Sequence, residues 1–366
     1  MWGGPRSGRA FLENVEWESC LVQPHRDAAL ERDVRQEFGV VPPALAYLSS
    51  VPWVARSLAA LQLVPSPHLH EDVCDLVRLV VAEDNSCRYC YAAQRTIMRL
   101  HGFSTRRIRE LEESRFAARL DPREALALEF ARHVSRIDAR LADDRARLAA
   151  VGWSEEAIAE LACVAAANVF ANRVATLQAL PIASVERAAR LPGLGLVAPL
   201  ARRLLFGARG ETAPLERGRC AGPWSFLVEA LARVPAGRVL RRVLDDACDS
   251  PVLPRRSKLL VFAVVARTVR CGRSEREAIR LLMDEGVEPE TIGEALRHLH
   301  SSHLDRADAA IVGFARETVR YRPAEIQRSA RRLEPLLGQE AILELIGVAA
   351  LANAVSRLAI VVGEPA

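Results

Sequence analysis

Two cysteines three positions apart, Cys87 and Cys90, are the residues of this chain with the clearest capacity for chemistry. Side chains at this spacing share one face of a helix, so the two thiols can form and reopen a disulfide with little rearrangement. An acid, Asp75, stands twelve positions before Cys87, and Gln94 stands four positions after Cys90. The pattern predicts thiol redox chemistry rather than a structural cross-link.

The expected start of a helix at these cysteines indicates which thiol ionises more readily. Ser86 is a suitable N-cap, which would put Cys87 in the first turn. Free backbone N–H groups and the helix dipole favour an anion there, and Arg88 adds a positive charge nearby. Because the thiolate is the reactive form of cysteine, we expect Cys87 to be the more acidic thiol.

Neighbouring side chains could move protons or orient a substrate. A hairpin of two helices could bring the carboxylate of Asp75 or Glu83 to the thiols as a proton acceptor, although a solvated or capping role explains Asp75 nearly as well. Gln94 lies one turn beyond Cys90, and its amide can hydrogen-bond a thiolate or a substrate but cannot carry a proton at neutral pH. A plain surface role explains Gln94 equally well. Tyr89, between the cysteines, fits packing better than chemistry.

A structural zinc site is a weaker interpretation of the cysteine pair. Such a site requires four ligands, and the sequence has no second Cys-x-x-Cys or His-x-x-x-His pair. His298, His300 and His303 do not all share one helical face, and no carboxylate pattern supports them. We therefore expect no metal and no other cofactor. Two inert, buried thiols are the other alternative.

The elements that must position these residues have the composition of helices. Ala, Leu, Arg and Glu dominate, and few alternating β-branched runs compete with them. The apolar run between Asp75 and Glu83 wraps most of a helix, which predicts a buried one. A second helix is expected from Cys87 to about Leu100, with Gly102 in the left-handed conformation after its end. The sequence predicts an all-α fold.

The sequence also repeats itself at a constant offset of 184 positions. Identical residues recur at this offset within four pairs of segments: 76–87 and 260–271, 102–110 and 286–294, 120–132 and 304–316, and 156–173 and 340–357. We interpret the repeat as a tandem duplication, with helical domains at 1–190 and 221–366. A linker rich in Gly and Pro is expected at 191–220, and an irregular segment without an assigned role at 1–40. The second copy has Cys271 and Ser274 where the first has its cysteine pair. Because serine cannot form a disulfide, that copy is expected to be degenerate.

Composition limits the class of protein and its surroundings. With 366 residues, 50% hydrophobic and 26% charged, the chain is typical of soluble globular proteins. Its net charge of +4 is spread along the chain and aromatic residues make up only 5%, which argues against binding of nucleic acid. The apolar run at 346–362 contains Asn353, Ser356 and Arg357, so no membrane span is expected. Eight cysteines without a secretory signal favour a cytoplasmic protein.

The segment Asp75-Leu-Val-Arg-Leu-Val-Val-Ala-Glu-Asp-Asn-Ser-Cys87-Arg-Tyr-Cys90 resembles the carboxymuconolactone decarboxylase superfamily, in its AhpD-like alkyl hydroperoxidase branch. That branch shows an acid, eleven residues, Cys-x-x-Cys, and a histidine four positions later. Asn172-Arg173 also resembles a recurring element of the last long helix in that branch. The resemblance covers roughly residues 42–180 and, more faintly, 222–362.

The resemblance implies a helical domain that assembles into trimers or hexamers, so three chains of fused pairs would form a pseudo-hexamer. It implies an antioxidant peroxidase that reduces a hydroperoxide, or a disulfide, with electrons from a thioredoxin-like or lipoyl-bearing partner. By this analogy Cys90 attacks the peroxide and Cys87 resolves the sulfenic acid as a disulfide. The helix-dipole argument favours Cys87 instead, so the assignment stays open.

Two departures from the branch bear on its chemistry. The histidine of the branch falls on Gln94, and its glutamate falls on the shorter Asp75. Proton transfer would then depend on Asp75, Glu83, Tyr89 or water, so peroxidase activity is expected to be weak or redirected. The alternatives are a non-enzymatic or redox-sensing oligomeric scaffold and, less favoured, a decarboxylase- or isomerase-like enzyme of the same superfamily.

Overall fold

The computed structural model describes residues 12, 14–113, 120–182 and 220–362, and within these ranges it contains helices and no strand. The all-α class predicted from the sequence is confirmed. Most of the predicted linker, 191–220, lies outside the described residues. The helices run in chain order as α2 Ala28–Phe38, η1 (a 3-10 helix) Pro43–Tyr47, α3 Pro52–Leu63, α4 Glu71–Asp84, α5 Arg88–Leu100, α6 Thr105–Glu113, α7 Pro122–Arg136, α8 Leu141–Ala150, α9 Glu155–Leu177, α12 Ser225–Ala230, α13 Pro235–Asp249, α14 Arg255–Thr268, α15 Gly272–Asp284, α16 Pro289–His298, α17 Arg306–Glu317, α18 Pro323–Leu337 and α19 Gln339–Val362.

Helix α2 lies within the first forty residues, which were expected to be irregular. Asp27 caps it by accepting N–H bonds from Ala29 and Leu30, and Gly39 ends it at φ 75°. Leu30 and Val34, one turn apart, bury its inner face. These are ordinary capping and periodicity signals, so the sequence carried the information for this helix.

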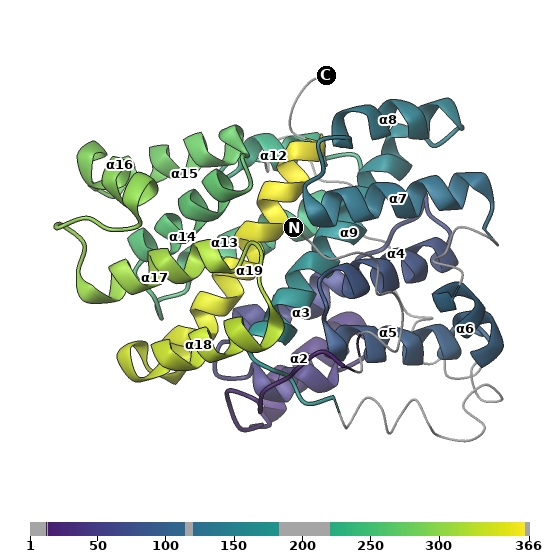
Figure 1. Cartoon of the computed structure of the whole chain (residues 1–366), viewed down its shortest axis with the longest axis horizontal. Coiled ribbons are helices and arrows are strands. Elements are labelled where there is room, and N and C mark those ends of the chain that lie inside the picture. The colour runs from purple at the N-terminus through teal and green to yellow at the C-terminus, as the bar shows by residue number, and fades with distance from the viewer. Residues whose placement is uncertain (1–11, 13, 114–119, 183–219, 363–366) are drawn as a thin grey trace.

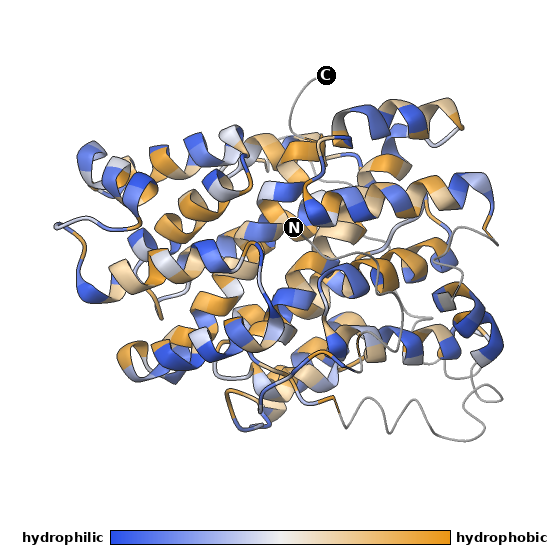
Figure 2. Ribbon diagram, in the orientation of Figure 1, coloured by the Kyte–Doolittle hydropathy of each residue, from blue (hydrophilic) through white to orange (hydrophobic). Residues whose placement is uncertain are grey.

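Two long helices, α9 and α19, pack against each other at the centre of the molecule and are buried along most of their length (Figure 1). Outer helices such as α7 and α18 alternate polar and apolar residues along their ribbons, because only one face of each meets the core (Figure 2). By length and composition α9 and α19 could also cross a membrane, but 94% and 89% of their apolar windows are buried inside the protein. Packing in the core accounts for their apolar character.

Helix positions recur at the offset found in the sequence. Helices α4, α5 and α9 start at residues 71, 88 and 155, and α14, α15 and α19 start at 255, 272 and 339, which is 184 positions later in each case. Packing recurs as well: α4 contacts α5, α7 and α9, and α14 contacts α15, α17 and α19. In Figure 1 α4–α8 lie to the right and α14–α17 to the left, with the yellow helix α19 crossing between them. These coincidences support the predicted duplication.

One ion pair is repeated with its charges reversed. In the first half Glu71 at the start of α4 lies 3.3 Å from the Nε2 atom of His101, the residue that follows α5. In the second half Arg255 at the start of α14 lies 3.3 Å from Glu285, the residue that follows α15. Both pairs connect the outer ends of a helical hairpin. The geometry of the hairpin is therefore the same in the two halves although the chemistry of the contact differs.

The halves also exchange hydrogen bonds through two buried arginines. Arg173 of α9 donates to the carbonyls of Thr318 and Val319 at the end of α17, both at 3.0 Å. Arg357 of α19 donates to the carbonyl of Ser135 near the end of α7, at 3.2 Å. A guanidinium at a helix C-terminus satisfies carbonyls that have no partner within the helix and complements the helix dipole. Each half thus supplies hydrogen-bond donors to carbonyls at a helix end of the other half.

Candidate thiol site

The cysteine pair lies where α4 turns into α5. Cys87 is the N-cap residue of α5, and its sulfur accepts the backbone N–H of Cys90 at 3.3 Å. The expected cap, Ser86, is instead in the left-handed conformation at φ 51°. The reason is that the N–H of Cys87 bonds back to the Ala82 carbonyl at the end of α4, so the chain must reverse at Ser86. The helix begins one residue later than the sequence suggested.

The two thiols differ in exposure and in hydrogen bonding. Both are free; Cys87 is fully buried, whereas Cys90 is partly exposed. The Cys90 thiol lies 3.7 Å from the Ala171 carbonyl of α9 and can donate to it. Burial raises the pKa of Cys90 well above its ordinary value, and the neighbouring Cys87 raises it further. Cys90 is therefore held mainly as the thiol, and Cys87 occupies the N-cap position of α5.

The described contacts of the Asp75 carboxylate are with side chains other than the two cysteines. Its carboxylate accepts a hydrogen bond from the Gln94 amide at 2.9 Å, lies 2.6 Å from Nδ1 of His101, and lies 3.6 Å from Arg78. Asp75, Gln94 and His101 therefore form one polar group further along the α4–α5 hairpin. His101 was not selected from the sequence, because its contact depends on how the two helices pack. These interactions orient Gln94, one turn from Cys90.

Glu83 and Tyr89 are also placed by the structure. Glu83 forms an ion pair with Arg132 of α7 at 3.0 Å, which occupies its carboxylate. Tyr89 is packed beside the thiols: burial is the main cause of its raised pKa, and Cys90 and Cys87 contribute next. A phenol with a raised pKa keeps its proton at neutral pH. Tyr89 can therefore donate a hydrogen bond near the sulfurs but is a weak proton acceptor.

Four further side chains complete the site, three from α9 and one from the second half. The Asn172 amide lies next to Cys90 and partly offsets the rise in its pKa, but neither of its polar atoms has a hydrogen bond of standard geometry. Tyr321, in the connection between α17 and α18, has a buried hydroxyl without such a bond, and so has Thr176 next to it. Arg173 lies over the Tyr321 ring, 5.6 Å from its centre. Unpartnered buried polar atoms are uncommon in folded proteins, so this cluster around a thiol marks a candidate functional site.

Sequence reasoning reached Asn172 only through the family resemblance and missed Tyr321 altogether. Tyr321 lies 231 positions after Cys90, and the residue 184 positions before it is Ile137, which has no polar group. The repeat therefore gave no signal for it. Only the contact between halves brings Tyr321 near the thiols, in addition to Tyr89 of the first half.

The second half lacks a matching site. Cys271 is the N-cap of α15, as Cys87 is of α5, and Ser274 occupies the place of Cys90. The Ser274 side chain is buried and its hydroxyl has no hydrogen-bond partner. One oxygen and one sulfur cannot form a disulfide, so the predicted cysteine chemistry is confined to the first half.

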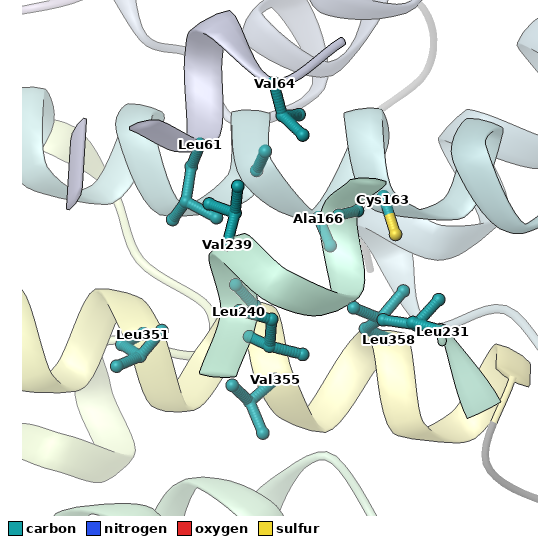
Figure 3. A pocket seen from close by; sticks show the side chains of 13 residues that line it. Leu61, Val64, Cys163, Ala166, Leu231, Val239, Leu240, Leu351, Val355 and Leu358 are labelled. Atoms are coloured by element: carbon teal, nitrogen blue, oxygen red, sulfur yellow. The ribbon is translucent and has the colours of Figure 1, made fainter. Parts of the chain in front are cut away.

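A small apolar pocket lies elsewhere, between α3, α9, α13 and α19 (Figure 3). Its volume is about 30 Å³, and leucine and valine side chains surround it with Cys163 as the one sulfur. A substrate site needs convergent polar groups and more room, so this pocket is a packing defect. Among the described residues, no three His, Cys, Asp or Glu side chains lie together as a metal site would require.

Comparison of this chain with protein-family models, with curated proteins and with solved structures finds no match. The relation to the hydroperoxidase branch therefore rests on the residues between Asp75 and Cys90 and on Asn172-Arg173. Function has to be argued from the thiol site itself.

Proposed function

We propose that this protein is a thiol-dependent oxidoreductase that reduces a hydroperoxide, or a disulfide, through a reversible disulfide between Cys87 and Cys90. The observation that carries the proposal is the joint placement of both thiols at the start of α5, with the Cys87 sulfur 3.3 Å from the Cys90 nitrogen. At this separation a sulfur–sulfur bond needs side-chain rotation and little movement of the backbone. Cys90 is partly exposed as a residue whereas Cys87 is fully buried, so a substrate would approach the pair from the side of Cys90.

The cycle balances with a dithiol as the second substrate. The hydroperoxide oxidises the two thiols to a disulfide and is itself reduced to an alcohol and water. A thioredoxin-like or lipoyl-bearing partner then returns two electrons and two protons to the sulfurs. We further propose that the halves are copies of one ancestral domain, that the protein acts in the cytoplasm, and that three chains assemble into a pseudo-hexamer.

A second candidate function is a non-enzymatic, oligomeric scaffold. Two observations favour it: the pKa of the accessible thiol of Cys90 is raised, and Asp75 is engaged by Gln94 and His101 rather than by a sulfur. Both features would slow formation of a thiolate. A scaffold of this kind would still have two thiols but would not catalyse the reduction of a peroxide or a disulfide.

The decisive experiment compares the full chain with Cys87→Ser and Cys90→Ser in tert-butyl hydroperoxide and dithiothreitol. Serine is a good N-cap, so Cys87→Ser should preserve the start of α5, and Cys90→Ser reproduces the residue present at Ser274. We expect the wild type to consume peroxide, both variants to lose this activity, and Cys248→Ser, a thiol outside the site, to retain it. Wild-type protein without cysteine-dependent consumption would favour the scaffold.

A further inference from the structure

We propose that Tyr321, contributed by the second half, is the proton donor to the leaving oxygen when the thiol site reduces a hydroperoxide. This inference rests on the function proposed above and names the group that replaces the missing histidine. It assigns a chemical role to a half that has lost its own cysteine pair.

The position of Tyr321 is fixed from the first half. Arg173 donates hydrogen bonds to the carbonyls of Thr318 and Val319, the residues just before Tyr321 in the α17–α18 connection. The same guanidinium lies over the Tyr321 ring at 5.6 Å. Arg173 follows Asn172, whose amide lies against Cys90, and Ala171, whose carbonyl faces the Cys90 thiol at 3.7 Å. One turn of α9 thus holds both the reactive sulfur and the loop that carries the tyrosine.

The hydroxyl of Tyr321 is available for a substrate. It is buried, and the Thr176 hydroxyl close to it also makes no hydrogen bond of standard geometry. Burial of a hydroxyl without a partner is unfavourable, so a partner that arrives with the substrate would be favoured. The unpartnered amide of Asn172 offers a second hydrogen-bonding group on the Cys90 side.

The other candidate donors are less suited to this step. Gln94 cannot release a proton, and both Asp75 and Glu83 are occupied by ion pairs or hydrogen bonds away from the sulfurs. For Tyr321, burial raises the pKa most, the positive charge of Arg173 lowers it, and both thiols lie near enough to raise it. An alkoxide is a much stronger base than a phenolate, so a phenol with a raised pKa can still protonate it. Tyr89 shares the site but lacks an arginine over its ring among the described contacts.

The step balances in atoms and electrons. The Cys90 sulfur forms a bond to the terminal oxygen of the hydroperoxide, the O–O bond breaks, and the alkoxide leaves with the proton of Tyr321. The proton given up by the Cys90 thiol is taken up by the Tyr321 phenolate, which restores the phenol. The net change is one thiol and one hydroperoxide to one sulfenic acid and one alcohol, with sulfur oxidised by two electrons and the peroxide reduced by two. Cys87 then displaces water to form the disulfide.

A leaving-group comparison tests this role. Tyr321→Phe removes a hydroxyl that makes no hydrogen bond, so it should not disturb the fold; thermal unfolding checks this point. Wild type, Tyr321→Phe and the control Tyr47→Phe are each assayed with tert-butyl hydroperoxide and with peracetic acid. The first releases a basic alkoxide that needs a proton, and the second releases a carboxylate that does not. We expect Tyr321→Phe to lose at least about 100-fold with the alkyl hydroperoxide, the lower end of the range for general-acid catalysis, and less than about 2-fold with the peracid.

The outcomes separate this inference from the proposed function. Equal losses with both oxidants, or no loss with either, would overturn the role of Tyr321 and leave the thiol cycle intact. A wild type that consumes neither oxidant through Cys87 and Cys90 would overturn the function and this inference with it. A selective loss in Tyr321→Phe and full activity in Tyr47→Phe would establish a proton donor supplied across the two halves.

Discussion

A buried carboxylate in the first half, Glu160, should make the stability of this protein depend on pH. Its counterpart 184 positions later, Glu344, accepts a hydrogen bond from the Trp53 indole at 2.8 Å and another from the Leu253 backbone, and it lies 3.7 Å from the amino group of Lys258. Glu160 accepts one bond, from the His68 backbone at 2.9 Å, and its other oxygen has no partner. The same acid is therefore well partnered in one half and poorly partnered in the other.

The sequence explains the difference. Lys258, the only lysine of the chain, has Cys74 as its counterpart 184 positions earlier. Helices α3 and α13 both begin with Val-Pro, and the next residue is Trp53 in α3 but Ala236 in α13. The cation and the indole N–H that hold Glu344 are thus absent around Glu160. The pKa of Glu160 is raised from 4.5 to about 7: burial is the main cause, the hydrogen bond from the His68 backbone lowers the pKa, and the nearby Glu156 raises it.

The magnitude and sign follow from this shift. A carboxyl whose pKa is raised in the folded state binds a proton that the unfolded chain has already released between pH 4.5 and about 7. Stability therefore falls as pH rises through that window, by about 3 kcal/mol at roughly 1.4 kcal/mol per unit, and is level above it. Glu160→Gln keeps the side chain neutral and so removes this loss of stability at higher pH. The variant should match wild type near pH 4.5 and exceed its free energy of unfolding by about 3 kcal/mol at pH 8.

The assay is denaturant unfolding, followed by helical circular dichroism, of both proteins between pH 4.5 and 8. The difference between them isolates Glu160, since other titrating groups contribute to both curves. Glu344→Gln is the matched control and should destabilise at pH 8, because it leaves the Lys258 amino group buried without its carboxylate. A constant difference between wild type and Glu160→Gln across this range would refute the reasoning.

Three further outcomes can be measured by denaturant unfolding. Lys258→Met leaves Glu344 buried without its cation and should cost about 3–5 kcal/mol; a loss below 1 kcal/mol would show that the pair is not coupled. Arg173→Leu removes the donor to the Thr318 carbonyl and to the Asn85 side-chain oxygen, and it leaves the Val319 carbonyl only the Arg357 contact at 3.4 Å. It should cost about 2–5 kcal/mol, whereas an unchanged midpoint would contradict the contact between halves. Gly347→Ala would place a Cβ atom 2.4 Å from Val54 and should cost about 1–3 kcal/mol, whereas Gly313→Ala, where the Cβ meets nothing within 4 Å, should be neutral or stabilising.

The fold was largely readable from the sequence because its signals are local. The expected ends of α5 were nearly right, and Gly102 has the predicted left-handed conformation at φ 98°. The cap at Ser86 was wrong by one residue, because a long-range bond from Cys87 to the end of α4 decides where the chain reverses. Caps and periodicity therefore predict which helices form, and tertiary contacts adjust where they begin.

Only part of the candidate site could be predicted from the sequence. The cysteine pair and Gln94 lie within one helix, so their common face follows from spacing alone. The partners of Asp75 depend on how α4 packs against α5, and the contribution of Tyr321 depends on how the two halves meet. Distances in sequence carry no information about such contacts when no homologous chains are compared. The missing information was the arrangement of helices and not their identity.

The hydrogen bonds exchanged through Arg173 and Arg357 make the two halves thermodynamically inseparable. Each guanidinium is buried in its own half and satisfies carbonyls at a helix end of the other, so either half in isolation would contain unsatisfied polar groups on both sides of the break. Unfolding should accordingly proceed as a single cooperative transition rather than as two independent ones. A destabilising substitution far from the cysteines, in the half without them, would then reduce the population of molecules able to carry out thiol chemistry.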